Sequence, residues 1–348
     1  MNSAYVFAKI IKDFYERRTH ALKRLNKQSL FKLSLTLLSS ILILSIGLAG
    51  CSSDSGSSSD NTTSASGDSK GTTASSEKRK TVTDFLMPEA SGLVVYGDDN
   101  VSIDASNTDQ GYVMVSVDSS DSRIKVQITD PTENVYTYDL KIGNYETFPL
   151  SGGDGTYTVD VLENVSDNNY ARLVSQDIDV SLSNEFLPFL YPNQYAWYES
   201  GDNVVNFGIK LSDHSSDDLD YLTQVYHYVI ENIEYDYDKA ETVKTSYLPD
   251  VNETFETGKG ICWDYASLMT ALLRSQKIPT KLLIGYSGTA YHAWISVYLE
   301  ESGWIDNIIS FDGTDWKLMD PTMAASKDEE AAEEYIGDGS NYTVKYTY

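Results

Sequence analysis

Apolar side chains hold every second position in several short runs between residues 92 and 182. In one run Val113, Val115 and Val117 alternate with other residues, and turn-forming clusters such as 118–121 and 152–155 separate the runs. Period-two alternation interrupted by regular turns is typical of antiparallel strands, so we expect a β-sandwich over residues 81–185. The other alternating sets are Ile124, Val126 and Ile128, then Tyr136, Tyr138 and Leu140, then Tyr157, Val159 and Val161.

After residue 216 the spacing of the apolar residues changes to that of a helix. Ser216 suits the N-cap, and the acidic residues after it favour the positive start of a helix. A second helix is predicted to begin near Cys262 and to stop before Pro279, which has no backbone N–H to donate. The apolar face of the first helix is formed by Leu219, Leu222, Tyr226, Val229 and Ile233.

Strand-like runs follow the second predicted helix. An acidic stretch at residues 327–334 is interpreted as an exposed helical turn, and residues 342–348 alternate as a closing strand would. Helices followed by strands indicate an α+β domain, which we place at residues 186–348 with its core at 217–323. The remaining strand-like runs are 281–286, 293–299, 304–310 and 316–319.

The stretch between these two patterns, residues 184–215, is rich in aromatic side chains and contains two prolines. We favour packing of these rings at a domain junction. A sugar-binding aromatic platform is the alternative. The aromatic residues are Phe186, Phe189, Tyr191, Tyr195, Trp197 and Tyr198.

The start of the chain has the pattern of an export signal. A basic segment precedes an uncharged apolar run at residues 33–50, and the run ends in Leu48-Ala49-Gly50-Cys51, which resembles a bacterial lipobox. We therefore expect residues 1–50 to be a signal peptide and Cys51 to be lipidated. An uncleaved membrane helix is the alternative, because the run is just long enough to span a bilayer. Residues 51–80 are rich in Ser and Gly, which predicts a flexible linker. These features place the protein on the extracellular face of a bacterial cell membrane, held there by its lipid.

Composition narrows the classes of function. The formal net charge is −26, which makes nucleic-acid binding unlikely because phosphate contacts need a basic surface. Of the two cysteines, acylation would consume Cys51, so Cys262 is the one free thiol and no intrachain disulfide is expected. A zinc site of several cysteines is excluded as well. No stretch has the spacing of an EF-hand loop, and we expect neither a metal ion nor a cofactor.

Three residues carry candidate chemistry. Cys262 begins a predicted helix, where unpaired N–H groups favour a thiolate and could stabilise an oxyanion. His292 begins a strand downstream and is the histidine best placed to act as a general base. Asp320 follows another strand-like run and could orient the imidazole. Each residue also has an ordinary interpretation, as an inert buried thiol, a structural histidine and a turn signal before Pro321.

The joint pattern of these residues resembles the transglutaminase-like core. The shared motifs begin with Gly258-Lys259-Gly260-Ile261-Cys262 at a helix start and include His292-Ala293-Trp294 and Asp320-Pro321-Thr322. The resemblance implies a papain-like fold with Cys262 as nucleophile, His292 as base and Asp320 as orienting acid. Ile261 and Trp263 depart from the small residues that often flank the cysteine in this family. Further matching positions are Tyr235-Asp236-Tyr237, Asp264, Ala266, Leu272-Leu273-Arg274, Ile278-Pro279, Gly285-Tyr286 and Trp316.

Residues 152–164 resemble the penultimate hairpin of Ig-like modules on bacterial surfaces, so the expected architecture is an Ig-like antiparallel β-sandwich followed by the papain-like core. The triad that the resemblance implies supports acyl transfer through a thioester. An amine acceptor would give crosslinking, and water would give proteolysis or deamidation. The expected substrates are proteins or peptides, cell-wall peptides among them. Two alternatives stay open, namely a non-catalytic binding module that keeps the fold, and a wall- or solute-binding lipoprotein in which the sandwich is the working part.

Overall fold

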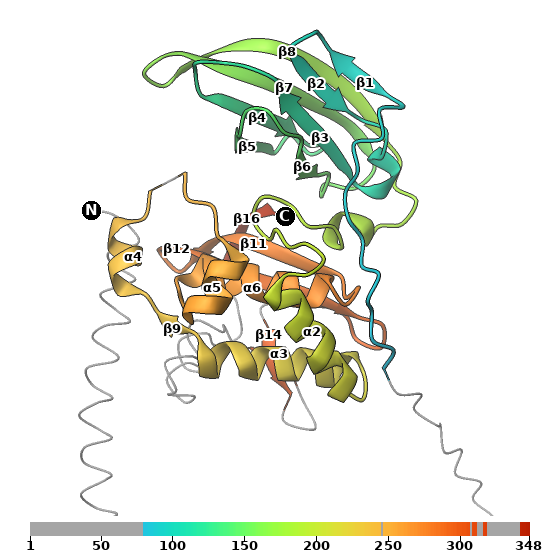
Figure 1. Cartoon of the computed structure of the whole chain (residues 1–348), viewed down its shortest axis with the longest axis vertical. Coiled ribbons are helices and arrows are strands. Elements are labelled where there is room, and N and C mark those ends of the chain that lie inside the picture. Colours follow the sequence, from blue (N-terminus) through green and yellow to red (C-terminus); the bar gives the residue numbers. More distant parts are fainter. Residues whose placement is uncertain (1–78, 245, 307, 312–315, 319–341) are drawn as a thin grey trace, which may run out of the picture. The chain divides into compact units, whose positions relative to one another are not determined.

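The computed structural model describes residues 79–348, apart from residues 245, 307, 312–315 and 319–341. The first half of this stretch forms strands with short connections, and the second half mixes helices with strands (Figure 1). The change of pattern that the sequence shows near residue 184 therefore corresponds to a real change of architecture.

Two four-stranded antiparallel sheets make up the first half. One has the order β1-β2-β3-β6 and the other the order β5-β4-β7-β8. The strands of the first sheet are β1 (Val95–Gly97), β2 (Val101–Asp104), β3 (Tyr112–Val117) and β6 (Glu146–Pro149). Those of the second are β4 (Ile124–Thr129), β5 (Val135–Leu140), β7 (Gly155–Ser166) and β8 (Asn169–Val180).

The alternating residues of the sequence form the core between these sheets. Val113, Val115 and Val117 lie on β3 and are fully buried, and the predicted sets on β4, β5 and β7 are buried with them. Burial of alternate side chains fixes the register, since a slip of one residue would expose a whole strand face. The assignment of this half as Ig-like stays a prediction.

The second half places helices around one four-stranded antiparallel sheet of order β13-β12-β11-β16. Its strands are β11 (Thr280–Ser287), β12 (Ala290–Leu299), β13 (Gly303–Ile305) and β16 (Tyr342–Thr347). The helices are α2 (Asn203–His214), α3 (Asp218–Asn232), α4 (Tyr237–Thr242), α5 (Val251–Thr257) and α6 (Cys262–Arg274). Two short pairs complete it, β9 (Glu234–Tyr235) with β10 (Lys259–Gly260), and β14 (Ile308–Phe311) with β15 (Trp316–Leu318). One-turn 3₁₀ helices lie at Thr108–Gln110 and Leu187–Phe189.

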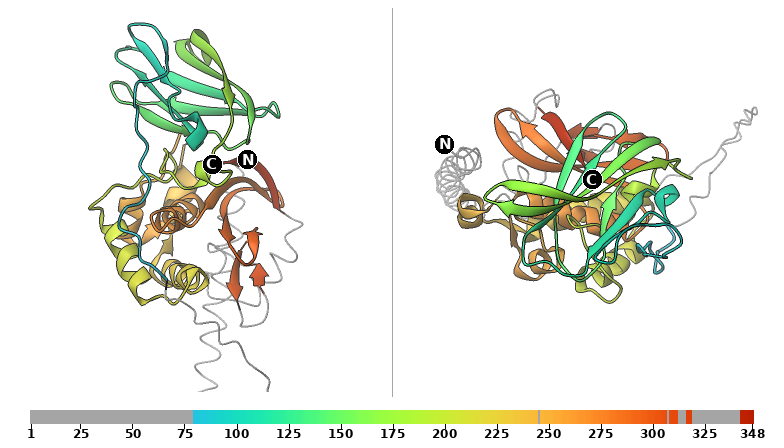
Figure 2. Two further views of the ribbon diagram at one scale, coloured as in Figure 1. Left: turned by 90° about the vertical axis from the view of Figure 1, so that its right-hand side faces the viewer. Right: turned by 90° about the horizontal axis from the view of Figure 1, so that it is seen from above.

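Helix α6 is the centre of this half. It packs against α2, α3 and α5 on one side and against β11 and β12 on the other, as the side view in Figure 2 shows. Every residue from Asp264 to Arg274 is buried, which agrees with an apolar sequence that surrounds the helix instead of forming a stripe. The helix that begins at the candidate nucleophile is therefore held from all sides.

Several predicted boundaries are corrected by the structure. Helix α2 lies within the aromatic stretch at residues 184–215, for which the sequence predicts no helix. The N-cap of α3 is Asp217, one residue after Ser216, and its carboxylate accepts the N–H of Asp220 at 2.8 Å. The run 304–310 is divided between β13 and β14. The closing strand is present as β16.

Arg274, the last residue of α6, joins the helix to the sheet. Its guanidinium is fully buried and donates to the backbone carbonyl oxygens of Thr280, Tyr348 and Tyr191 at 2.6–2.9 Å. Burial lowers the pKa of this group to about 10. One side chain thus ties together α6, the sheet and the aromatic stretch that precedes α2.

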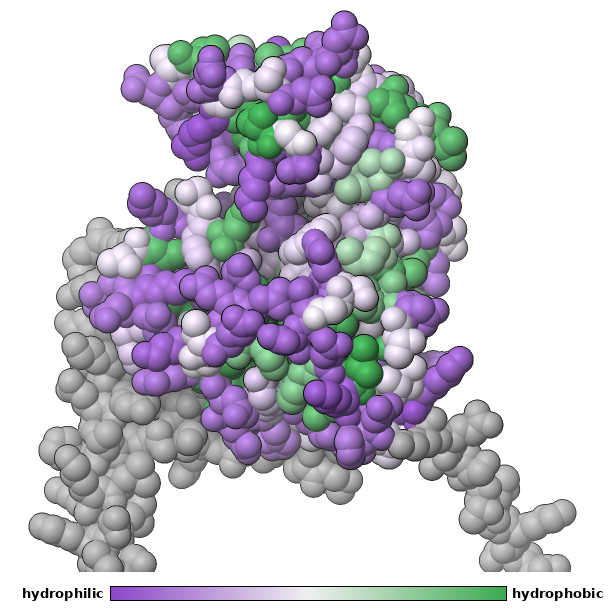
Figure 3. Space-filling model, in the orientation of Figure 1, coloured by the Kyte–Doolittle hydropathy of each residue, from purple (hydrophilic) through white to green (hydrophobic). Residues whose placement is uncertain are grey.

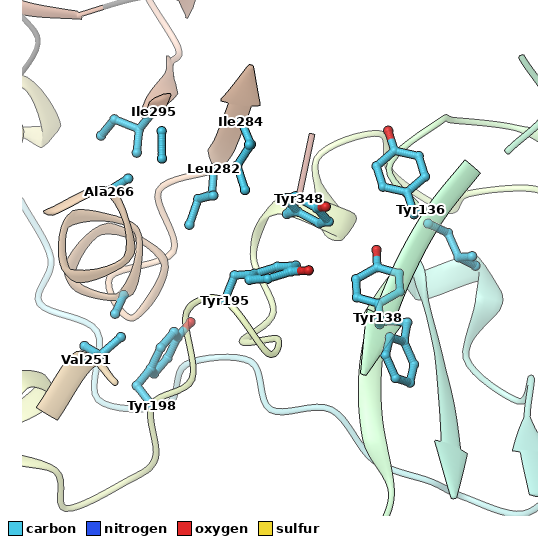
Figure 4. Close-up of a cluster of buried hydrophobic side chains, with 14 of the residues drawn as sticks. Tyr136, Tyr138, Tyr195, Tyr198, Val251, Ala266, Leu282, Ile284, Ile295 and Tyr348 are labelled. Atoms are coloured by element: carbon cyan, nitrogen blue, oxygen red, sulfur yellow. The ribbon is translucent and has the colours of Figure 1, made fainter. Parts of the chain in front are cut away.

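The aromatic residues before α2 pack at the junction between the two halves, as expected. Tyr195 lies 6.0 Å from Tyr138 of β5 and 4.3 Å from Tyr348, ring centre to ring centre (Figure 4). Ser151 donates a hydrogen bond to the carbonyl oxygen of Thr347 at 2.7 Å. Trp197 is the exception in this stretch, since 39% of its side-chain surface is exposed.

Hydrophilic side chains cover most of the described surface that Figure 3 shows. Within the described ranges no helix is both long and apolar enough to cross a membrane. The predicted signal peptide, Cys51, the linker up to residue 78 and the helical turn at 327–334 lie outside those ranges.

Candidate active site

Cys262 is the first residue of α6, and its thiol is free and half-buried. The chain arrives through β10, which pairs in parallel with β9, and Ile261 is extended at the N-cap. A side chain at Gly260 would place its Cβ 2.5 Å from the Cβ of Asp264, so only glycine fits there. Close packing against Asp264, and not backbone flexibility alone, therefore explains the glycine at position 260 of the motif.

Asp264 organises this helix start. Its Oδ2 accepts the N–H of Ile261 at 2.8 Å, which satisfies a backbone donor that the helix leaves unpaired. The carboxylate is completely buried, and it pairs with Nζ of Lys239 at 2.8 Å and accepts from the hydroxyl of Tyr247 at 2.5 Å. Burial and this carboxylate together raise the pKa of Tyr247. A fully paired acid therefore stands two residues after the candidate nucleophile.

The upstream motif Tyr235-Asp236-Tyr237 positions the helix that carries Lys239. Asp236 follows β9 and caps α4 by accepting the N–H of Lys239 at 2.8 Å. Helix α4 is less than two turns long, so the cap fixes the direction of the whole helix and with it the lysine. Sequence reasoning matched the motif but did not find Lys239 or Tyr247. A buried Asp264 needs a positively charged or hydrogen-bonding partner, and this need is the one sequence feature that points to Lys239 and Tyr247.

Aromatic rings surround the first turn of α6. Trp263 stacks on Tyr195 with 5.4 Å between ring centres, and Tyr247 meets it edge-on at 6.3 Å. Tyr291 of β12 is partly exposed and lies edge-on to Tyr286 at 5.5 Å. Burial raises the pKa of Tyr291 to about 12, and the nearby Tyr346, Tyr286 and Cys262 add to the rise. Tyr291 therefore lies close enough to the thiol of Cys262 to be affected by it.

His292 lies on β12 beside Tyr291, and only 1% of its surface is exposed. Its ring stacks on Trp294 with 6.1 Å between centres, and Tyr342 of β16 lies 6.3 Å away. Its strand partner is Gly285, where an added Cβ would come within 1.9 Å of the carbonyl oxygen of Thr343. Glycine at this position lets β16 pair closely with β11.

Two of the three predicted residues lie on elements that pack together. Helix α6, which begins with Cys262, rests on β12, which carries His292. The residues of β12 in the shared core are Ala293 and Ile295. His292 alternates with them along the strand, so its side chain lies on the opposite face of β12. The residue of this strand that lies near the thiol is Tyr291, whose pKa Cys262 helps to raise. Asp320 lies outside the described residues, so its predicted role stays a prediction.

The described residues hold no cluster of three or more His, Cys, Asp or Glu side chains that could bind a metal ion. The chemistry that this arrangement supports is that of a thiol at a helix start. Backbone N–H groups at the start of a helix are suited to stabilise negative charge that develops on an acyl oxygen.

Comparison with known proteins identifies the class. Residues 206–307 match the profile of the family described as the Transglutaminase-like superfamily, and the match includes both Cys262 and His292. The chain therefore carries a transglutaminase-like domain, as the motifs indicated.

Individual relatives are distant. Over 202 residues the chain is 26% identical to the UPF0252 protein MJ1282 of Methanocaldococcus jannaschii, covering 52% of this chain and 57% of that protein. Over 69 residues it is 33% identical to YebA of Bacillus subtilis, which is described as uncharacterized, covering 15% of this chain and 9% of YebA. The chain spans little more than half of the first relative and a small part of the second.

Two solved structures are similar to the chain. A cysteine-protease candidate from Cytophaga hutchinsonii has a TM-score of 0.31 and 15% identity, covering 61% of this chain and 71% of that one. Red sea bream transglutaminase has a TM-score of 0.27 and 13% identity, covering 61% of this chain and 48% of that one. At this level of likeness, neither structure bears on the activity of the chain.

Proposed function

We propose that the protein is a lipid-anchored enzyme of the bacterial cell surface that transfers acyl groups through a thioester on Cys262. The observation that carries this proposal is the position of Cys262. It is the free thiol of the described chain, it begins the central helix of a transglutaminase-like domain, and that helix packs on the strand of His292.

In the first half of the proposed reaction, the sulfur of Cys262 attacks the carbonyl carbon of a carboxamide or peptide bond. A C–S bond forms, the C–N bond breaks, and the imidazolium of His292 gives its proton to the leaving amine. In the second half, His292 takes a proton from an incoming amine or water, the new bond to carbon forms and the C–S bond breaks. Asp320 would hold the imidazole in the tautomer that both halves need.

Several observations support the substrate class. The exposed rings of Tyr286 and Tyr291, the second of them near Cys262, offer flat apolar surface, which suits an extended peptide better than a small ion. The strongly acidic composition disfavours acidic substrates. The proposed anchor at Cys51 would bring such a site to cell-wall peptides and surface proteins. The Ig-like assignment of the sandwich, as a spacer or binding module, belongs to the same proposal.

The test is incubation of the protein with cell-wall peptides and with glutamine-containing proteins, each with and without a primary amine, followed by mass spectrometry. A gain of the amine with loss of ammonia would show transfer, and a gain of water with loss of ammonia, or cleavage of the peptide, would show hydrolysis. Either mass change must disappear in Cys262→Ala. If the wild-type protein and Cys262→Ala give the same spectra, the domain is a binding module that keeps the fold.

A further inference from the structure

A hollow in the described chain has walls that do not include the proposed catalytic residues. Its volume is about 370 Å³, and its walls come from residues 141 and 145–147 of the sandwich, residues 194 and 197 of the junction and residues 248–252 at the start of α5. This size falls in the range of small-molecule sites, which is about 300–1,000 Å³. Neither Cys262 nor His292 lines it.

Two aromatic rings in the walls have their polar ends occupied elsewhere. Nε1 of Trp197 donates to Glu199 at 2.9 Å, and the hydroxyl of Tyr145 shares a hydrogen bond with Ser102 at 2.7 Å. Nevertheless 39% of Trp197 and 38% of Tyr145 remain exposed. Trp197 and Tyr145 therefore present ring surface to the hollow.

Two side-chain amides in the walls donate hydrogen bonds through their nitrogens but accept none through their oxygens. Nε2 of Gln194 donates to the carbonyl oxygen of Asp139 at 2.7 Å, and Nδ2 of Asn252 donates to Asp202 at 2.9 Å. Their oxygens, and the hydroxyl oxygen of the buried Thr147, have no hydrogen-bond partner among the described residues. A buried acceptor without a donor is destabilising, so the described residues leave this site short of hydrogen-bond donors.

The charged groups of the hollow do not select an ion. The carboxylate of Asp250 caps α5 by accepting the N–H of Glu253 at 2.9 Å. Glu146 accepts from the side chain of Gln194 and from the backbone N–H of Lys141, and burial raises the pKa of its carboxyl group. Lys141 lies in the same wall, so its ammonium group partly balances the two carboxylates.

We propose that this hollow binds a neutral saccharide. A sugar ring presents an apolar C–H face, which fits the exposed rings of Trp197 and Tyr145, and hydroxyl groups, which can hydrogen-bond with the amide and charged side chains of the walls. An anion would meet the acceptor oxygens, and a cation would meet Lys141. The site does not depend on the acyl transfer proposed for Cys262, and it would let the protein hold a glycan while it acts on a peptide.

Saturation-transfer NMR on the full chain tests this proposal with four neutral disaccharides, namely chitobiose, cellobiose, maltose and lactose. We expect transfer to at least one of them, with at least a tenfold loss of affinity in Trp197→Ala and in Gln194→Ala. Trp197→Phe keeps a ring and should retain most of the affinity. Tyr170→Ala is the matched control, because Tyr170 lies on β8 and does not line the hollow.

Lack of transfer to all four disaccharides would overturn the proposal, and so would transfer that persists unchanged in both Trp197→Ala and Gln194→Ala. The near-ultraviolet circular dichroism of each variant shows whether it is folded, and the exposed Trp197 makes loss of folding unexpected. Cys262→Ala should bind the same saccharide as the wild-type protein. Failure of acyl transfer would therefore leave this result intact, and failure of saccharide binding would leave acyl transfer intact.

Discussion

Asp264 shows how much depends on a single side chain near the proposed nucleophile. Its carboxylate is buried beside the start of α6, and Lys239 supplies the neutralising charge at 2.8 Å. Without that charge, a negative group would stand two residues from the thiol and would disfavour a thiolate. Lys239 is therefore a positioning residue, because it acts on the sulfur through Asp264.

Lys239→Met tests this role. We expect the midpoint of the pH dependence of Cys262 alkylation to move to higher pH, and the free energy of unfolding to fall by about 1–3 kcal/mol because Asp264 loses its charged partner. Lys259→Met removes an exposed lysine close to Cys262 and should change neither quantity. Adding Asp264→Asn to Lys239→Met should return the alkylation midpoint towards that of the wild-type protein. An unchanged midpoint in Lys239→Met would refute the role.

Asp130 makes the stability of the sandwich depend on pH. Burial raises the pKa of its carboxyl group, but hydrogen bonds from Thr132 and Asn134 outweigh burial and hold the pKa below its ordinary value. A carboxyl group with a lowered pKa stabilises the folded state at neutral pH and stops doing so as the pH falls below about 4.

We therefore expect Asp130→Asn to lower the free energy of unfolding by about 1–3 kcal/mol at pH 7 and by much less at pH 3. Urea denaturation at the two pH values measures this difference. Asp121→Asn changes an exposed carboxylate in a neighbouring turn and serves as the control. A loss that is equally large at both pH values would contradict the charge-based explanation.

At the scale of the elements, Arg274 makes the connection between α6 and the sheet. Its guanidinium donates to carbonyl oxygens that belong to three separate segments of the chain. The residues that carry those oxygens are buried, so the cost of removing the arginine includes the loss of a hydrogen-bond partner for each oxygen.

Arg274→Met should reduce the free energy of unfolding by about 3 kcal/mol or more, since several charge-assisted hydrogen bonds to buried carbonyls are lost together. Chemical denaturation measures the change. Arg123→Met is the matched control, because Arg123 forms an exposed ion pair with Asp139, and such pairs contribute about 0–1 kcal/mol. Similar losses in the two variants would show that Arg274 does not clamp the sheet.

The elements also show what sequence patterns can predict. Alternation located β3, β4, β5 and β7 correctly because their inward residues are apolar throughout. Helix α2 was missed because Asn206, Gly208 and two prolines nearby weaken its pattern, while its contacts with α5 and α6 hold it in place. The predicted N-cap of α3 differs from the observed one by one residue. Ser216 and Asp217 are both good N-cap residues, and only the fold selects between them.

At the scale of the whole molecule, local motifs located the candidate site, but its support could not be predicted. Cys262 and His292 stand out through their neighbours in the sequence. By contrast, the contacts of Lys239 with Asp264 and of Arg274 with Tyr191 join residues that only the tertiary fold brings together. The hollow at Trp197 has the same origin, since three distant segments form its walls.

The packing of Tyr195 against both Tyr138 and Tyr348 predicts that the described chain unfolds as one cooperative unit. We expect a single transition in scanning calorimetry of the wild-type protein. Tyr195→Ala should divide it into two or lower its midpoint strongly, because removal of a buried aromatic ring costs about 3–5 kcal/mol. Tyr170→Ala, on the sandwich alone, should leave one transition. Two separate transitions in the wild-type protein would contradict this coupling.

The most direct test of the central claim is the rate at which iodoacetamide alkylates Cys262 at pH 7. The proposed pairing of thiol and imidazole predicts fast modification in the wild-type protein and a rate at least tenfold lower in His292→Ala, with His227→Ala, an exposed histidine on α3, behaving as the wild type. A wild-type rate equal to that of a free cysteine in solution, unaffected by His292→Ala, would contradict it.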